Sequence, residues 1–210
     1  MGPFVILAGV FAVFIPALML PGPDFIAVVR SSMTRGTVAG LWTTLGVSLC
    51  LGIYAALSLA GLSAILIEYQ LLAWAVRILG GCYLIYLGLK LLFAQPVRLE
   101  MRDHGDKPKG NPLVFGFLVT STNPKAIILF TSVFATAVTE STPFWLMLLM
   151  VVLVIGSALV WYTLVTLFMS SAPIIRRFQH LQHWIERAAG VCFVAIGGRI
   201  LSDARNPVAP

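Results

Sequence analysis

The sequence predicts an all-α membrane protein, and its composition is the first reason. Apolar residues make up 59% of the 210 residues and charged residues only 10%, whereas a typical soluble domain contains roughly half and roughly a quarter. A folded chain of this size cannot hide so much apolar surface from water, so lipid must cover the remainder. Long runs without charge are the second reason, because a membrane-spanning helix needs about 20 mostly apolar residues.

Six membrane-spanning helices are expected. They lie at roughly residues 4–28, 38–62, 70–92, 113–137, 143–170 and 184–202. The third and fourth are each interrupted by one cation, Arg77 and Lys125, and the sixth carries Glu186, Arg187 and Arg199 near its ends. The first has no basic leader and is longer than the apolar core of a signal peptide, so it should remain as a membrane helix.

The positions of lysine and arginine predict the orientation of these helices. Ten of the 14 lie in the connections after the first, third and fifth spans, three lie on the opposite face, and Lys125 lies within a span. Cytoplasmic loops carry an excess of Lys and Arg, so these connections should be cytoplasmic and both termini should lie outside. The last of them should be a basic loop around Arg176 and Arg177. This bias accounts for the net charge of +6, and no nucleic-acid partner is expected.

The only long polar stretch divides the chain into two halves. We expect a first three-helix unit at residues 1–93, a cytoplasmic linker at 94–112 and a second three-helix unit at 113–210. Because each half crosses the bilayer an odd number of times, two related halves would have opposite orientations and form an inverted repeat. Such repeats are typical of transporters, whose substrate sites lie at the repeat interface.

Two similarities between the halves favour a duplication. Pro23-Asp24 in the first span matches Pro124-Lys125 in the fourth. The third and sixth spans each carry two glycines seven residues apart on one helix face, where small residues allow close packing. These glycines are Gly81 and Gly88 in the third span, and Gly190 and Gly197 in the sixth. We therefore predict six transmembrane helices arranged as two inverted three-helix repeats.

Prolines should break the first and fourth of these helices. A proline removes a backbone donor and clashes with the preceding turn, and Pro16, Pro21 and Pro23 fall within eight residues of the first span. The freed backbone groups are tolerated in a bilayer only beside protein or a water-filled cavity. Ionisable side chains in a membrane are pathway candidates by default. The predicted site residues are Pro21, Gly22, Pro23 and Asp24 in the first half, and Thr120, Ser121, Thr122, Asn123, Pro124 and Lys125 in the second.

A structural interpretation of the same residues is also open. Asp24 and Lys125 could form an ion pair that only stabilises the fold, and the prolines could only kink their helices. Asp24 could also lie near the cytoplasmic end of its span. We expect instead a site built where two broken helices face each other, because one ionisable residue of each sign occurs at matching points of the two halves.

Several segments resemble the signature segments of the lysine exporter and homoserine–threonine exporter family, LysE/RhtB. They are Pro21-Gly22-Pro23-Asp24-Phe25, Arg35-Gly36 with Gly40, Gly81 to Gly88, and Asn123-Pro124-Lys125-Ala126-Ile127. The resemblance extends over nearly the whole chain and is greatest to the threonine-efflux branch. It implies a six-span exporter of small amino acids in the bacterial inner membrane, driven by an ion gradient.

On this basis the expected substrate is a threonine- or homoserine-like amino acid, exported in exchange for protons. Lys125 and the N-termini of the half-helices would receive its carboxylate, and Asp24 or freed carbonyls its ammonium. The hydroxyls of Thr120, Ser121 and Thr122 would favour a polar side chain. Asp24 is the expected proton carrier, because burial favours its neutral form and Lys125 favours its charged form. The sequence leaves a homo-oligomer open.

A metal-ion exporter of a related six-span fold and an intramembrane enzyme are the alternatives. The exporter should carry several His, Cys or acidic residues in its spans, and the enzyme should carry a nucleophile–base pair or a metal site there. The predicted spans contain no histidine, and the three cysteines are far apart in the sequence. Neither alternative is favoured, and no metal or other cofactor is expected.

Overall fold

The chain is helical throughout the part that is described. The computed structural model describes residues 2–68, 70–93, 110–137, 142–168 and 172–204, and no β-strand occurs among them. The helices are α1 (Pro3–Met19), α2 (Pro23–Arg35), α3 (Thr37–Glu68), α4 (Gln70–Leu92), α5 (Pro112–Ser121), α6 (Pro124–Ala137), α7 (Phe144–Phe168) and α8 (Ala172–Ala204). The predicted all-α class is therefore confirmed. Most of the predicted linker, residues 94–109, lies outside the described residues.

Two segments are each broken into a pair of helices. α1 and α2 meet at a bend of 46°, and α5 and α6 meet at a bend of 62°. Both breaks lie at the prolines predicted to interrupt these segments, because Pro21, Pro23 and Pro124 have no amide hydrogen to donate to the preceding turn. Pro16 does not contribute to a break. It lies inside α1, and its carbonyl accepts from the amide of Leu20 at 3.2 Å.

Several helices are long and apolar enough to cross a bilayer. Thr37–Gly61 of α3 and Phe144–Phe168 of α7 each meet this requirement alone. Each bent pair meets it if its two helices form one span, and the described apolar part of α4, Ile78–Leu92, is shorter. Many large apolar side chains on α3 and α7 are exposed, as contact with lipid requires. The chain is thus an all-helical membrane protein.

Two helix boundaries differ from the sequence-based expectation. α3 continues to Glu68, beyond the predicted end at residue 62, and α8 begins at Ala172 instead of near residue 184. The predicted basic loop around Arg176 and Arg177 is therefore wrong, because these residues belong to α8. Lys and Arg mark a membrane surface, but arginine is a good helix former and does not end a helix.

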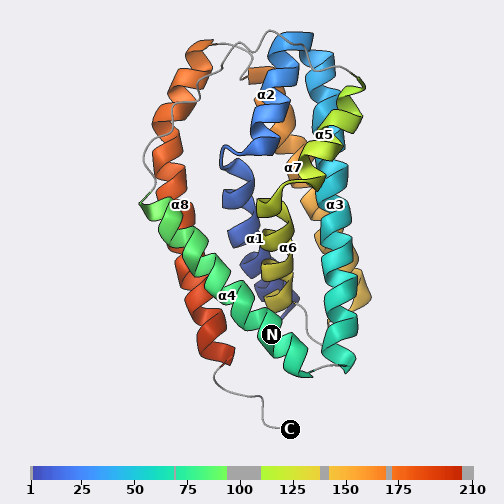
Figure 1. The fold of residues 1–210 in the computed structure, drawn as a ribbon, viewed down its shortest axis with the longest axis vertical. Helices are drawn as coiled ribbons and strands as arrows, with labels where there is room; N and C mark the ends of the chain where they lie inside the picture. Colours follow the sequence, from blue (N-terminus) through green and yellow to red (C-terminus); the bar gives the residue numbers. More distant parts are fainter. Residues whose placement is uncertain (1, 69, 94–109, 138–141, 169–171, 205–210) are drawn as a thin grey trace.

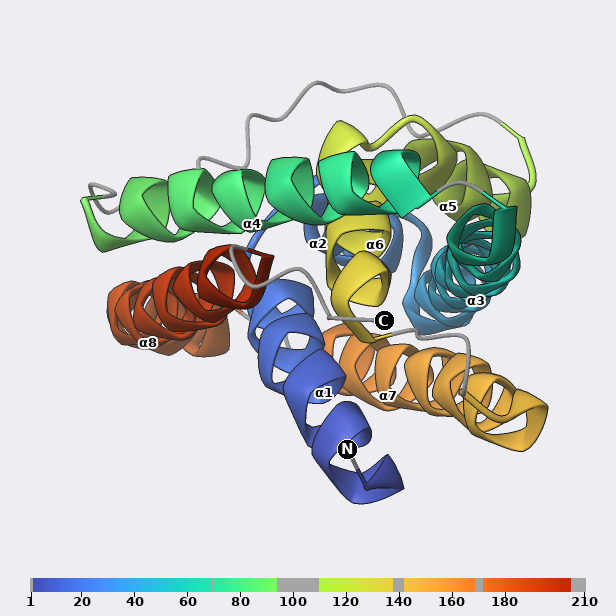
Figure 2. The same ribbon diagram turned by 90° about the horizontal axis from the view of Figure 1, so that it is seen from below.

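The two breaks lie between longer helices (Figures 1 and 2). α4 and α8 lie on one side, α3 and α7 lie on the other, and α1 and α6 lie between these pairs. α2 packs against α3, α5 and α7. Unbroken helices therefore surround both breaks.

α4 and α8 pack backbone against backbone at their glycines. A Cβ atom at Gly88 would lie 2.8 Å from the carbonyl oxygen of Gly190, and one at Gly197 would lie 2.7 Å from that of Gly81. No side chain fits at these distances, so the crossing requires glycine. The contact is reciprocal. Gly81 of α4 meets Gly197 of α8, and Gly88 of α4 meets Gly190 of α8.

Candidate functional site

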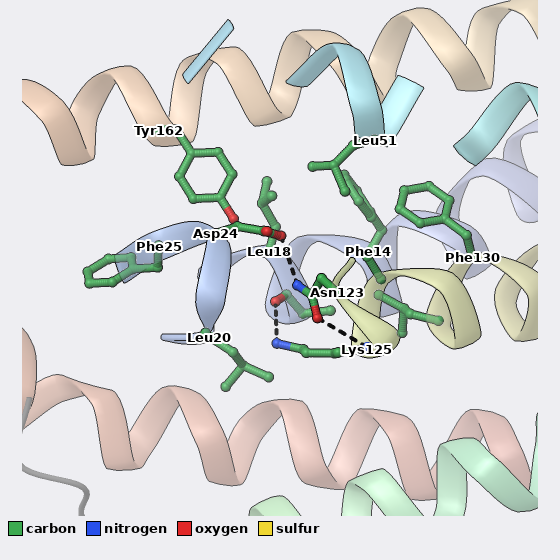
Figure 3. Close-up of a pocket in the computed structure, with 14 residues that line it drawn as sticks. Phe14, Leu18, Leu20, Asp24, Phe25, Leu51, Asn123, Lys125, Phe130 and Tyr162 are labelled. Atoms are coloured by element: carbon green, nitrogen blue, oxygen red, sulfur yellow. Dashed lines mark hydrogen bonds between the residues drawn. The ribbon is translucent and has the colours of Figure 1, made fainter. Parts of the chain in front are cut away.

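The ends of the broken helices line a small cavity (Figure 3). Its volume is about 30 Å³, which holds about two water molecules, since one water needs roughly 10–15 Å³. Four polar side chains line it, those of Asp24, Asn123, Lys125 and Tyr162. The other lining residues are apolar: Phe14, Ala17, Leu18, Leu20, Gly22, Phe25, Leu51, Ala126, Leu129 and Phe130.

Lys125 reaches from α6 to a carbonyl that is freed at the end of α1. In an uninterrupted helix the Ala17 carbonyl would accept from the amide of residue 21, but Pro21 has no amide hydrogen. The Nζ atom of Lys125 donates to this oxygen instead, at 3.2 Å. A cation from the second half of the chain therefore stabilises the break in the first half.

Asp24 lies in the first turn of α2 and is bound by groups from the second half. Its side chain is buried, with 8% exposed. Oδ1 accepts from Oγ1 of Thr120 at 3.0 Å, and Oδ2 accepts from Nδ2 of Asn123 at 3.2 Å. The N-terminus of a helix also attracts negative charge. The position of Asp24 and its two donors therefore suit a carboxylate.

Asn123 stands between the two charged groups. While its Nδ2 binds Asp24, its Oδ1 accepts from the backbone amide of Lys125 at 3.1 Å and so begins α6. Within the described part of the chain, no hydrogen bond or ion pair joins Asp24 directly to Lys125. The direct pair of the structural interpretation is therefore not present, and each charged group bonds to a group from the opposite half.

The remaining predicted residues shape the breaks without lining the cavity. Ser121 Oγ and Thr122 Oγ1 each donate to the carbonyl oxygen of Leu118 at 2.9 Å. Because these bonds lie within the last turn of α5, the two hydroxyls are directed away from the site. The prolines act through the backbone by ending or beginning helices, and they are Pro21, Pro23 and Pro124.

Two tyrosines at the breaks were not predicted from the sequence. Tyr162 of α7 is 3% exposed, and its ring points toward Asp24 (Figure 3). Tyr54 of α3 donates from its hydroxyl to the carbonyl oxygen of Ser121 at 2.8 Å. That carbonyl lacks its usual helical donor, the amide of residue 125, which binds Asn123. The only sign of them in the sequence was that each tyrosine lies in the middle of a long apolar run.

Glu186 is a further ionisable group near the site. It was noted only as a charge near the end of the sixth span, but it is buried on α8, with 7% exposed. Its charge is close enough to interact with that of Lys125. In the part of the chain that the structure describes, no three His, Cys, Asp or Glu side chains are grouped so as to hold a metal ion.

The chemistry of the cavity suits a molecule that carries both charges. One wall presents the carboxylate of Asp24, another presents the ammonium of Lys125, and two helices begin at its edge, at Pro23 and Pro124. An amino acid is larger than the present space. It would therefore have to separate the half-helices in order to bind.

Comparison with known proteins gives the relatives of this chain. Residues 15–204 match the family described as LysE type translocator. The threonine efflux protein of Escherichia coli (strain K12) is 30% identical over 189 residues, which cover 88% of this chain and 92% of that protein. The threonine efflux protein of Salmonella typhimurium is 29% identical over 194 residues, covering 88% and 92%. An uncharacterised membrane protein of Haemophilus influenzae is 26% identical over 200 residues, covering 91% and 93%. No solved structure matches the chain.

Proposed function

Because this chain belongs to the family of LysE-type translocators, which are transporters and not enzymes, we propose that it exports a small amino acid from the cytoplasm in exchange for protons. The threonine efflux proteins that match most of the chain support a threonine- or homoserine-like substrate. The proposed location is the bacterial inner membrane.

We further propose six spans in two inverted repeats, at residues 1–93 and 113–210, joined by a cytoplasmic linker at 94–112, with both termini outside. The reciprocal glycine contacts between α4 and α8 support this arrangement, because a two-fold axis produces contacts of that kind. The two breaks support it as well, since each is stabilised by a side chain from the other half.

The observation that carries the proposal is the pair of opposite charges on one cavity. Asp24 and Lys125 both line it without bonding to each other. The ammonium of an amino acid would replace Asn123 or Thr120 at Asp24, and its carboxylate would replace the Ala17 carbonyl at Lys125. Helix N-termini at the cavity edge add to the attraction for the carboxylate.

The exchange of substrate for protons follows from competition for one carboxylate, that of Asp24. A proton and a substrate ammonium cannot both occupy Asp24, so the site carries one or the other. A proton from outside would displace the substrate there, and in the cytoplasm a new substrate would displace the proton. The proton gradient would then drive net export.

Transport by purified protein in lipid vesicles tests the role of Asp24. Asp24→Asn should abolish export of labelled threonine driven by an imposed pH gradient, while the protein still folds and inserts. Full pH-driven transport by this variant would exclude Asp24 as the proton carrier. Loss of folding would instead favour a structural role for its bonds to Thr120 and Asn123.

Binding tests the role of Lys125. Lys125→Ala should weaken substrate binding by about tenfold to a hundredfold, the usual effect of losing a hydrogen bond to a charged group. Lys90→Ala, at an exposed lysine near the end of α4, is the matched control. If Lys125→Ala behaves like this control in both affinity and rate, the carboxylate role is wrong.

A further inference from the structure

A row of hydroxyl groups is buried between α2, α3 and α7. It leads from the cavity toward the end of α2, where the chain turns into α3. The side chains are each at most 4% exposed: Ser31 and Ser32 of α2, Thr44 and Ser48 of α3, and Thr166 of α7. The transport site described above uses none of them.

The far part of the row is joined by hydrogen bonds. Ser32 Oγ donates to the carbonyl oxygen of Thr166 at 3.1 Å, and the hydroxyls of Thr44 and Thr166 lie 3.3 Å apart. The three helices meet here at Gly40, where a Cβ atom would lie 2.7 Å from Thr166 Cγ2 and 2.9 Å from Ser32 Cβ. This close approach is what brings the hydroxyls of three helices together.

The near part of the row reaches the cavity. Ser48 follows Thr44 by one turn of α3, and Leu51, which lines the cavity, lies about one turn further. On α7, Tyr162 precedes Thr166 by one turn, and its ring points toward Asp24 (Figure 3). The row therefore begins beside the carboxylate that the proposed function assigns to the proton.

Two hydroxyls of the row have no hydrogen-bond partner among the residues that the structure describes. Ser31 Oγ and Ser48 Oγ are fully buried, and neither bonds to another described group. Nearly all buried polar groups in proteins are hydrogen-bonded, because an unpaired one is unfavourable. Water that enters during the transport cycle would give both of them partners, one near each end of the row.

The length of α2, beside which the row lies, matches half of a bilayer. Asp24 and Arg35, near the two ends of α2, are 11 residues apart, which is about 16 Å at 1.5 Å per residue. Half of the hydrocarbon core is about 15 Å. Oxygens in a hydrogen-bonded chain lie about 2.8 Å apart, whereas Ser48 is one helical turn from Thr44 and Tyr162 is one turn from Thr166. Water must therefore complete the chain between these levels.

We propose that this hydroxyl row, completed by water, conducts the coupling proton between Asp24 and the cytoplasmic face. The inference rests on the proposed proton exchange and on the proposed orientation. The Asp24 carboxyl gives its proton to the nearest oxygen and becomes a carboxylate. Each oxygen accepts one proton and passes another on, so the hydroxyls are unchanged and the proton enters cytoplasmic water. The substrate, which is too large for this row, uses a different route.

Packing alone is the alternative explanation of the row. Small residues, including serine and threonine, let membrane helices approach closely. Under that explanation removal of a hydroxyl should not separate proton coupling from substrate movement, whereas under the proposal it should.

The test compares two transport modes of the full-length protein in lipid vesicles. The double variant Ser31→Ala with Ser48→Ala should slow pH-driven export of labelled threonine by on the order of tenfold, because two links of the chain are lost. The rate of exchange of labelled for unlabelled threonine, which moves no net proton, should stay within about twofold of the rate for the unaltered protein. The thermal stability should be unchanged or raised, because each substitution removes an unpaired hydroxyl. Ser48→Thr, which retains a hydroxyl, should restore coupling relative to Ser48→Ala.

Ser157→Ala is the matched control. Ser157 lies on α7, but its hydroxyl donates to the carbonyl of Leu153 at 2.6 Å within its own helix. If the double variant matches this control in pH-driven export, or if exchange slows as much as export, the hydroxyl row does not conduct the proton. Failure of the underlying function would be recognised separately, by full pH-driven export in Asp24→Asn.

Discussion

Replacing Gly46 with alanine should force α3 and α5 apart. A Cβ atom at Gly46 would lie 2.0 Å from the backbone oxygen of Leu113 and 2.9 Å from the backbone nitrogen of Phe117, whereas ordinary contacts begin at 3.4 Å. The helices would have to separate by the difference, 1.4 Å, at the point of contact. A flexible side chain could move aside, but here both obstructing atoms belong to the backbone of α5.

The expected loss of stability follows from this overlap. Extra atoms in a packed interior typically reduce the free energy of unfolding by about 1–3 kcal/mol. α5 also carries Thr120, whose hydroxyl donates to Asp24 at 3.0 Å, so a displaced α5 would weaken that bond. We therefore expect Gly46→Ala to lower both the melting temperature and the rate of export.

Thermal denaturation of the purified protein in detergent, with transport measured in vesicles, provides the test. The matched control is Gly156→Ala on α7, where a Cβ atom would meet nothing within 4 Å. A helical glycine replaced in open space should gain about 0.5–1 kcal/mol of stability. The two variants should therefore shift the melting temperature in opposite directions. If Gly46→Ala is as stable as this control, α3 and α5 are not packed as described.

Three further variants address individual contacts. Tyr54→Phe removes the donor to the Ser121 carbonyl and should lower the free energy of unfolding by about 1 kcal/mol. An unchanged melting temperature would show that the bond does not stabilise the break. Thr120→Val removes one of two donors to Asp24 and should raise the KM for export severalfold, and Thr120→Ser should restore it. If Thr120→Val has the same KM as the unaltered protein, this contact does not contribute to the site. Gly88→Ala places a Cβ atom 2.8 Å from the backbone oxygen of α8 and should lower the melting temperature; cross-linking of α4 to α8 by introduced cysteines would report whether the helices separate.

The sequence predicted those features that depend on rare residues. Helix breaks were predictable because proline lacks an amide hydrogen whatever surrounds it. Asp24 and Lys125 were chosen as candidate site residues because a charge in an apolar run requires a reason, and the structure places both on one cavity. Close packing at the glycines was predictable, since glycines seven residues apart share one helix face. Which helix packs there was not predictable, because it depends on how α4 and α8 lie in space.

The remaining features depend on geometry that no local pattern encodes. The hydroxyls of Ser121 and Thr122 bond back to α5 because the helix ends there, and that direction is fixed only once the bend is known. Tyr162 follows Thr120 and Asn123, the residues that bind Asp24, at no regular spacing, so its place at the cavity could not be inferred. The start of α8 was misplaced because charge marks a membrane surface and not the end of a helix.

The bonds at the breaks also suggest how binding and movement are linked in the proposed mechanism. Lys125 holds the Ala17 carbonyl, while Thr120 and Asn123 hold Asp24, so every one of these bonds joins one half of the chain to the other. A substrate that takes over both charged groups breaks the connections that keep the cavity at about 30 Å³. The same event that binds the amino acid therefore loosens the two halves. A proton on Asp24 would leave the bond between Lys125 and Ala17 in place, so the two occupants would favour different arrangements of the same helices.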